Sequence, residues 1–127
     1  MLTTMSEITE QAARRLLIDY TCDMALSDED PERIVDRTMT ADAVWVTDGT
    51  TLTRDQLVGH AAPARKNVTS IEMRIDDLFV NGHEFAARCC LITEHRKRGH
   101  VVIDWILIGD VADDGRVRRI HQLGRTA

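Results

Sequence analysis

Apolar residues recur at helical spacing in the first half of the chain and alternate with polar residues in the second half. The first segment, Thr4–Glu7, fits the T-x-x-E capping box that opens a helix. An apolar stripe at helical spacing follows, made of Ala13, Leu16, Leu17, Tyr20 and Met24. We therefore expect a helix from Thr4 to about Leu26, with Tyr20 on its buried side.

Two shorter helices are expected further along. Asp30-Pro31 supplies an N-cap and a favourable first helical residue, which predicts a second helix over about 31–39. Thr53–Gln56 is a T-x-x-Q capping box and opens a third helix. This helix runs to about Arg65 and is expected to bend or restart at Pro63.

The remaining segments read as strands. Ala43–Thr47 is an apolar strand that turns at Asp48-Gly49. From Ser70 onward, four strands follow one another, with turns at Asn81-Gly82 and Asp114-Gly115. Helices followed by hairpin-connected strands indicate an α+β fold with the helices on one face of the sheet, in a single domain over 1–127.

Three stretches resemble the SnoaL-like branch of the nuclear transport factor 2-like superfamily in their order and spacing. They are Thr40–Trp45, Leu52–Val58 and Asp114–Val117. The resemblance covers nearly the whole chain and implies a curved, mixed sheet wrapped around three N-terminal helices as a cone with an internal pocket. The family includes polyketide cyclases, ketosteroid isomerases, dehydratases, epoxide hydrolases and non-catalytic modules, so the pocket residues must decide the function.

Comparison with the isomerases assigns three positions. If the Ser27–Glu32 loop carries a two-residue insertion, Tyr20 falls near the tyrosine that donates a hydrogen bond to the substrate oxyanion. The general base falls at Thr47, which cannot act as a base, or at Asp48, which also suits a turn. The third group, a protonated acid, falls at Leu107.

Asp104 is a carboxylate inside an apolar strand and needs a partner. A bulge would turn it into the pocket, where it would serve as an acid. Without a bulge it faces the outer side of the sheet and pairs with Arg119 or His121. Both readings stay open at this point.

The epoxide hydrolase comparison fails. Arg88 matches the arginine of that mechanism, but Cys90 and Gln122 stand where its two carboxylates belong. Those carboxylates activate water and protonate the epoxide oxygen. We therefore exclude this chemistry.

Histidine offers the remaining acid–base chemistry, because it exchanges protons near neutral pH. His60 shares a helix face with Leu57 and Ala61 and is the candidate base, although a half-exposed helix position explains it equally. His95 and His100 flank a basic turn, which we read as a solvated hairpin tip without metal.

The amino-acid composition limits which kinds of partner the chain is expected to bind. A net charge of -5 argues against nucleic acid, and no apolar run reaches the roughly 20 residues of a membrane span. The three cysteines are read as apolar core residues, and a cytoplasmic location is expected. An apolar outer sheet face needs cover, which predicts a homodimer through the convex face.

The sequence therefore predicts a pocket for a small hydrophobic, oxygenated molecule. Its expected lining is Tyr20, Trp45, His60, Arg88, Trp105, Ile120 and Gln122. One hypothesis is cofactor-free and metal-free isomerisation, dehydration or cyclisation, with His60 as the base and Asp104 as the alternative base. In this hypothesis Tyr20 and Arg88 stabilise the oxyanion. The other hypothesis is a non-catalytic binding or dimerisation module of the same fold.

Overall fold

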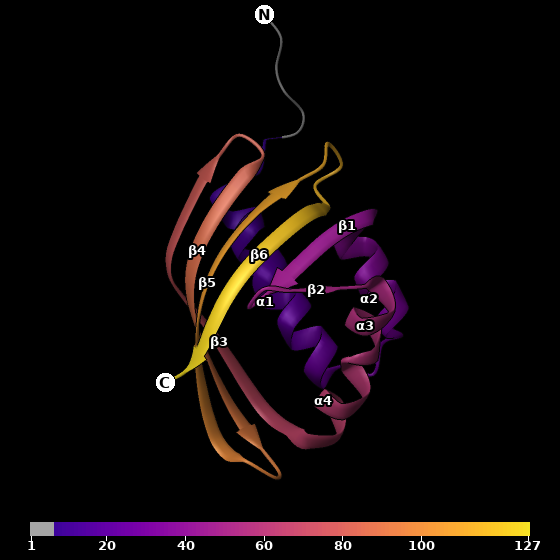
Figure 1. Cartoon of the computed structure of the whole chain (residues 1–127), viewed down its shortest axis with the longest axis vertical. Helices are drawn as coiled ribbons and strands as arrows, with labels where there is room; N and C mark the ends of the chain where they lie inside the picture. The colour runs from indigo at the N-terminus through magenta and orange to yellow at the C-terminus, as the bar shows by residue number, and fades with distance from the viewer. Residues whose placement is uncertain (1–6) are drawn as a thin grey trace, which may run out of the picture.

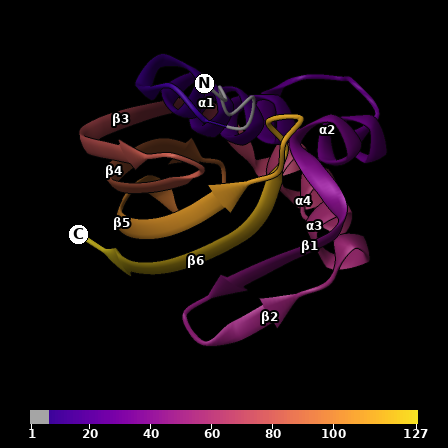
Figure 2. The ribbon, with the colours of Figure 1, turned by 90° about the horizontal axis from the view of Figure 1, so that it is seen from above.

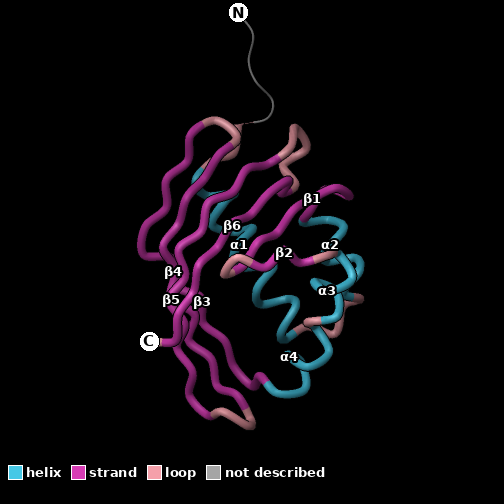
Figure 3. The backbone as a smooth tube through the Cα atoms, viewed as in Figure 1, coloured by secondary structure: helices cyan, strands magenta, loops and turns pink. Residues whose placement is uncertain are grey.

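The computed structural model describes residues 7–127 and places four helices against one six-stranded sheet (Figure 1). The helices are α1 (Glu10–Leu26), α2 (Pro31–Thr38), α3 (Arg54–Gly59) and α4 (Ala61–Asn67). The strands are β1 (Met39–Thr47), β2 (Thr50–Leu52), β3 (Val68–Asn81), β4 (Glu84–His95), β5 (Gly99–Val111) and β6 (Val117–Thr126). Figure 3 shows this division into a helical side and a stranded side.

The sheet has the order β2-β1-β6-β5-β4-β3. Strand β1 runs parallel to β6, and every other neighbouring pair is antiparallel. Seen end-on, the sheet curls into an open arc, with α1 along one side and α2–α4 along another (Figure 2). The predicted α+β cone with a mixed, curved sheet is confirmed. No helix within residues 7–127 is long and apolar enough to cross a membrane.

The first helix begins later than predicted. It starts at Glu10, where the side chain of Thr9 accepts a hydrogen bond from the Ala12 N–H at 3.0 Å. Thr4 lies outside the described residues, and Glu7 precedes the helix. The predicted start is wrong because Thr9, which also precedes the apolar stripe in the sequence, is a good N-cap as well.

The other two predicted caps are present. Asp30 Oδ1 accepts from the Glu32 N–H at 2.9 Å, and both hydrogen bonds of the Thr53–Gln56 capping box form. The third helix breaks at His60, three residues before the predicted site at Pro63. Pro63 lies in the first turn of α4, where its missing N–H has no helical partner to lose.

The core lies between the concave face of the sheet and the helices. Its largest fully buried side chains are Ile34, Val111, Val117, Ile120 and Cys89. Burial raises the pKa of the Cys89 thiol to about 11, so this cysteine behaves as a small apolar residue. Cys90 is also buried and Cys22 half-buried, and all three are free thiols.

Regular alternation along β4 and β5 decides which side chains face the helices. The two strands pair over their full length without a bulge. Odd-numbered residues of β5 from Val101 to Leu107 therefore line the concave side, and the even-numbered ones, including Asp104, lie on the convex side. Bulges occur elsewhere, between Ile75 and Asp77 on β3 and next to Arg118 on β6.

Gly109 on β5 is required by close packing. A Cβ atom at this position would lie 2.6 Å from Phe85 Cζ and 2.8 Å from the Arg119 carbonyl oxygen. Phe85 is buried, so its ring has no room to move aside. We expect Gly109→Ala to lower the free energy of unfolding by about 1–3 kcal/mol, measured by urea denaturation.

Gly59→Ala is the matched control. Gly59 ends α3, and a Cβ atom at this position would have no neighbour within 4 Å. Alanine there lowers the conformational entropy of the unfolded chain. The free energy of unfolding should therefore stay the same or rise by up to about 1 kcal/mol. Equal urea midpoints for the two variants would contradict this account of Gly109.

Candidate functional site

A cavity of about 700 Å³ lies between the helices and the concave face of the sheet. Its walls are mostly apolar, with α1, α3 and α4 on one side and the inward-facing residues of β1, β3, β4, β5 and β6 on the other. Of the seven residues expected to line it, six do: Tyr20, Trp45, His60, Trp105, Ile120 and Gln122. The structure thus brings together residues from helices and strands that are far apart in the sequence.

Tyr20 and Trp45 form an aromatic pair across the helical and stranded walls. Their ring centroids lie 5.5 Å apart with an interplanar angle of 36°. Burial raises the pKa of Tyr20 to about 12, so its hydroxyl stays protonated at neutral pH. This hydroxyl has no hydrogen-bond partner among the described residues, which leaves it available as a donor to a molecule in the cavity.

Gln122 lines the same cavity and has an unsatisfied polar atom. The parallel register sets Gln122 opposite Thr47, and Gln122 Nε2 donates to Thr47 Oγ1 at 3.1 Å. The other amide atom, Oε1, is buried without a partner in the protein. Whichever way the amide is turned, one of its polar atoms remains unpaired, and such an atom usually has a partner when a site is filled.

Asp48 does not face the cavity. It adopts a left-handed conformation with φ 49° in the β1–β2 turn. Its carboxylate accepts the Gly124 N–H at 2.9 Å, and its own N–H donates to the Gln122 carbonyl at 2.9 Å. Asp48 therefore ties the turn to β6, and Thr47 is the residue that lines the cavity at the position of the isomerase base.

Trp105 lies against the last strand. A Cβ atom on Gly124 would stand 2.5 Å from Trp105 Cδ1 and 2.8 Å from Nε1. Only glycine at 124 leaves the indole room in this place. Since Trp45 and Trp105 are the two tryptophans of the chain and both line the cavity, tryptophan fluorescence reports on its contents.

Two predicted site residues, Arg88 and Asp104, lie outside the cavity on the convex face. The Arg88 side chain is 58% exposed and its Nε lies 2.8 Å from Asp77 Oδ2. The Asp104 side chain is 44% exposed and pairs at 3.9 Å with Arg125, rather than with Arg119 or His121. The unbroken alternation of β4 and β5 causes both placements, because it turns even-numbered residues outward.

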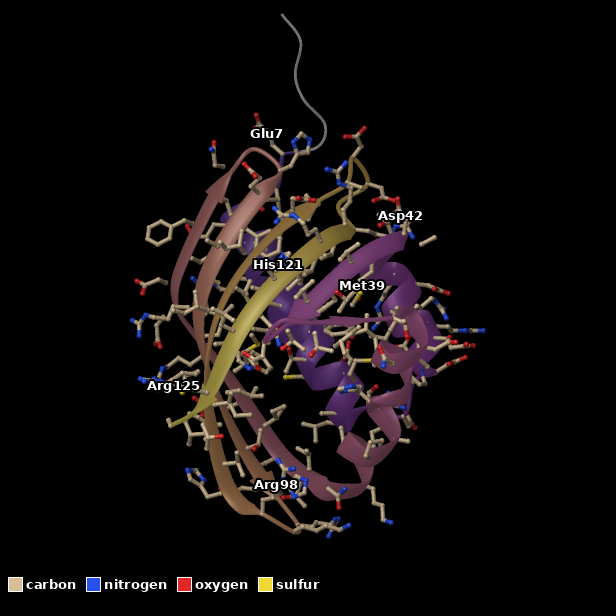
Figure 4. The ribbon with its side chains drawn as sticks, in the orientation of Figure 1. Glu7, Met39, Asp42, Arg98, His121 and Arg125 are labelled. Atoms are coloured by element: carbon tan, nitrogen blue, oxygen red, sulfur yellow. The ribbon has the colours of Figure 1, made fainter. Side chains whose placement is uncertain are left out.

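Basic residues at the rim were not expected in the site. His95, Lys97 and Arg98 line the cavity from the β4–β5 hairpin, which was read as a solvated tip. In Figure 4 the labelled Arg98 lies at this end of the molecule, whereas Arg125 points away from the helices. The tip is exposed to solvent, as predicted, but the curvature of the sheet also carries it to the edge of the cavity, which was not predicted. Curvature leaves no mark on the alternation of apolar residues.

His95 organises the hairpin tip. Its Nδ1 accepts the backbone N–H groups of Lys97 and Arg98, each at 3.1 Å. The neutral ring therefore carries its proton on Nε2, which remains a donor. His100 belongs to the other face, where it pairs with Glu94.

The lining determines what chemistry the site can support. It contains Tyr20, His60, His95, Lys97 and Arg98 as titratable groups and no aspartate or glutamate. Within residues 7–127 no group of three or more histidine, cysteine, aspartate or glutamate residues could hold a metal ion. A proton-transfer group in this cavity would therefore be one of His60, His95, Tyr20 and Lys97.

No protein-family sequence model matches the chain, and no curated protein matches it in sequence. Its fold matches solved structures. IdmH from Streptomyces antibioticus, a proposed polyketide cyclase, superposes with a TM-score of 0.68 at 15% identity, covering 90% of this chain and 91% of IdmH.

Two further structures agree with this match. A proposed SnoaL-like polyketide cyclase from Jannaschia sp. CCS1 gives a TM-score of 0.68 at 14% identity, covering 90% of this chain and 83% of its own. An NTF-2-like protein of unknown function from Silicibacter pomeroyi DSS-3 gives 0.63 at 18% identity, covering 92% and 94%. The chain therefore has the nuclear transport factor 2-like fold, which these structures share.

Proposed function

We propose that the cavity binds a small, largely apolar molecule that carries oxygen groups. The observation that supports this most directly is the buried, unpaired Oε1 of Gln122. A buried acceptor without a partner costs about 1–3 kcal/mol, and a ligand hydroxyl or N–H would remove that cost. The Tyr20 hydroxyl offers a second polar contact from the helical wall. The apolar lining around these two groups is typical of small-molecule sites.

A substitution that fills the cavity should abolish this binding. Ala64 lines the cavity from α4, so Ala64→Phe places a ring inside it. We expect the affinity for phenylnaphthylamine, a neutral apolar fluorescent probe, to fall by roughly tenfold or more because the ring occupies the probe's volume. Quenching of the two tryptophans by energy transfer to the probe measures the affinity.

Ala62→Phe is the matched control for this experiment. Ala62 lies on the same helix, is exposed and does not line the cavity. The control should bind the probe as the unchanged protein does. If both variants bind equally well, the probe does not enter the cavity and the proposed binding site is wrong.

Proton transfer on the bound molecule is the second candidate function, and His60 favours it. His60 stands at the break between α3 and α4, and its ring makes no hydrogen bond within residues 7–127. In this proposal the ring removes a proton from a carbon next to a carbonyl group. The neutral Tyr20 hydroxyl would then donate a hydrogen bond to the oxyanion that forms. This mechanism uses no cofactor, and it assigns no role to Asp104 or Arg88.

Deuterium exchange tests this mechanism without knowledge of the natural substrate. β-Tetralone is an apolar ketone with exchangeable protons next to its carbonyl group, and NMR follows their loss in deuterium oxide. We expect His60→Gln to lower the exchange rate to the solvent background and Tyr20→Phe to lower it about 10–1000-fold. Because the pKa of Tyr20 is raised to about 12, no alkaline loss of activity should appear below about pH 11.

His83→Gln is the control for that experiment, since His83 lies outside the cavity at the other end of the sheet. Both His60→Gln and Tyr20→Phe should still bind phenylnaphthylamine. If the unchanged protein exchanges protons no faster than solvent does, catalysis of this kind is contradicted. The cavity would then be that of a binding module.

A second copy of the chain is the partner we propose for the convex face. Five of the exposed large apolar residues of the described chain lie on this face: Val44, Phe79, Ile106, Ile108 and Leu123. The strand register sets Ile106 next to Leu123, and Ile108 lies in one cross-strand row with Phe79. A two-fold dimer would bury such a patch against itself.

The cytoplasmic location expected from the sequence stays a prediction.

Charge placed at the centre of the convex face should separate the two copies. We expect the unchanged protein to sediment at twice the mass of the chain and Ile106→Glu/Ile108→Glu to sediment as a monomer, because burying two carboxylates without partners is unfavourable. Leu26→Glu adds a carboxylate at an exposed apolar residue on α1 and should leave the dimer intact. A monomeric unchanged protein at micromolar concentration would contradict the proposed dimer.

A further inference from the structure

Two basic segments meet at the open end of the cavity. Arg65 and Lys66 end α4, and Arg96–Arg98 forms the tip of the β4–β5 hairpin. The Arg96 N–H donates to the Asn67 carbonyl at 2.7 Å, and Arg96 Nε donates to the Lys66 carbonyl at 3.0 Å. These bonds fasten the tip to the end of the helix. A chain of net charge -5 thus gathers five of its 16 basic residues at one rim.

The cations closest to the cavity have no counter-charge in the described chain. Lys97 and Arg98 line the cavity, and neither forms an ion pair or a side-chain hydrogen bond within residues 7–127. Glu94, on the same hairpin, pairs with His100 on the opposite face of the strand. The lining itself contains no carboxylate. The rim therefore offers an ammonium group, a guanidinium group and the Nε2–H of His95, and the lining has no carboxylate to offset their positive charge.

The cavity is long as well as apolar. It is lined along β5 by Val101, Ile103, Trp105 and Leu107, the first and last of which lie six residue steps apart. At roughly 3.3 Å per residue, this is about 20 Å of contour along the wall. Gln122 pairs with Leu107 at the inner end of this span, and Arg98 lies just beyond its outer end.

Resting on the proposed binding function, we propose that the cavity accepts an elongated amphipathic anion. Its carboxylate, sulfate or phosphate group lies at the rim between Lys97 and Arg98, and its apolar body extends along β5. A hydroxyl or N–H group near the far end of the molecule meets the free amide atom of Gln122. This arrangement gives the unpaired cations and the unpaired buried amide atom one common partner.

A matched pair of probes separates the charge from the apolar body. Anilinonaphthalene sulfonate carries the same two ring systems as phenylnaphthylamine, with one added sulfonate. We expect the unchanged protein to bind the sulfonate more tightly than the neutral probe, and Lys97→Gln/Arg98→Gln to weaken the sulfonate about tenfold. The neutral probe should lose much less affinity than the sulfonate does. Tryptophan quenching at one probe per chain gives the affinities.

Screening and charge controls complete the test. Arg15→Gln/Arg33→Gln also removes two positive charges, at exposed residues outside the cavity that form no ion pair within residues 7–127, and should leave both affinities unchanged. In about 1 M sodium chloride, where the screening length is about 3 Å, the unchanged protein should lose its preference for the sulfonate.

Each failure has a distinct meaning. Equal binding of the two probes by the unchanged protein, or a rim variant that binds the sulfonate normally, would overturn the anion proposal and leave the binding function standing. If the unchanged protein binds neither probe, the binding function itself is contradicted. Co-sedimentation with phosphatidylglycerol vesicles but not with phosphatidylcholine vesicles, lost in the rim variant, would assign the rim to a membrane surface and overturn a free ligand.

Discussion

The cavity depends on the parallel pairing of β1 with β6. This pairing joins a strand near the start of the chain to the last strand and sets Trp45 beside Ile120 and Thr47 beside Gln122. Asp48 locks the register, because its carboxylate accepts the Gly124 N–H and its own N–H donates to the Gln122 carbonyl. A shift of one residue would exchange inward and outward side chains on β1. It would remove both the Tyr20–Trp45 contact and the Gln122–Thr47 hydrogen bond.

Local sequence signals predicted the elements well where the governing interactions are local. The Thr53–Gln56 capping box and the Asp30 cap act within a few residues, and both form as predicted. The start of α1 was missed because two threonines compete as caps and a single pattern does not rank them. The break at His60 was missed for a similar reason, since proline is tolerated in the first turn of a helix.

The site was harder to predict because it depends on strand parity and sheet curvature. Tyr20, Trp105 and Gln122 were placed correctly in the lining because each lies on a regular element. Arg88 was placed wrongly because matching a motif to β4 without knowing its register left the parity open by one residue. The rim residues Lys97 and Arg98 depend on how far the sheet bends, a property of the whole sheet that no short stretch encodes.

The alternation that defines the cavity also defines the face proposed for the dimer. Trp105 lies against the cavity while its neighbour Ile106 is 60% exposed on the convex side, and Gln122 and Leu123 divide in the same way. The two faces share one layer of backbone, so a ligand that shifts the backbone of β5 and β6 at Trp105 would also shift the apolar patch. Gly124 sets the limit of that movement, because the indole already rests against its backbone. The inner wall is therefore closely packed where Trp105 meets β6.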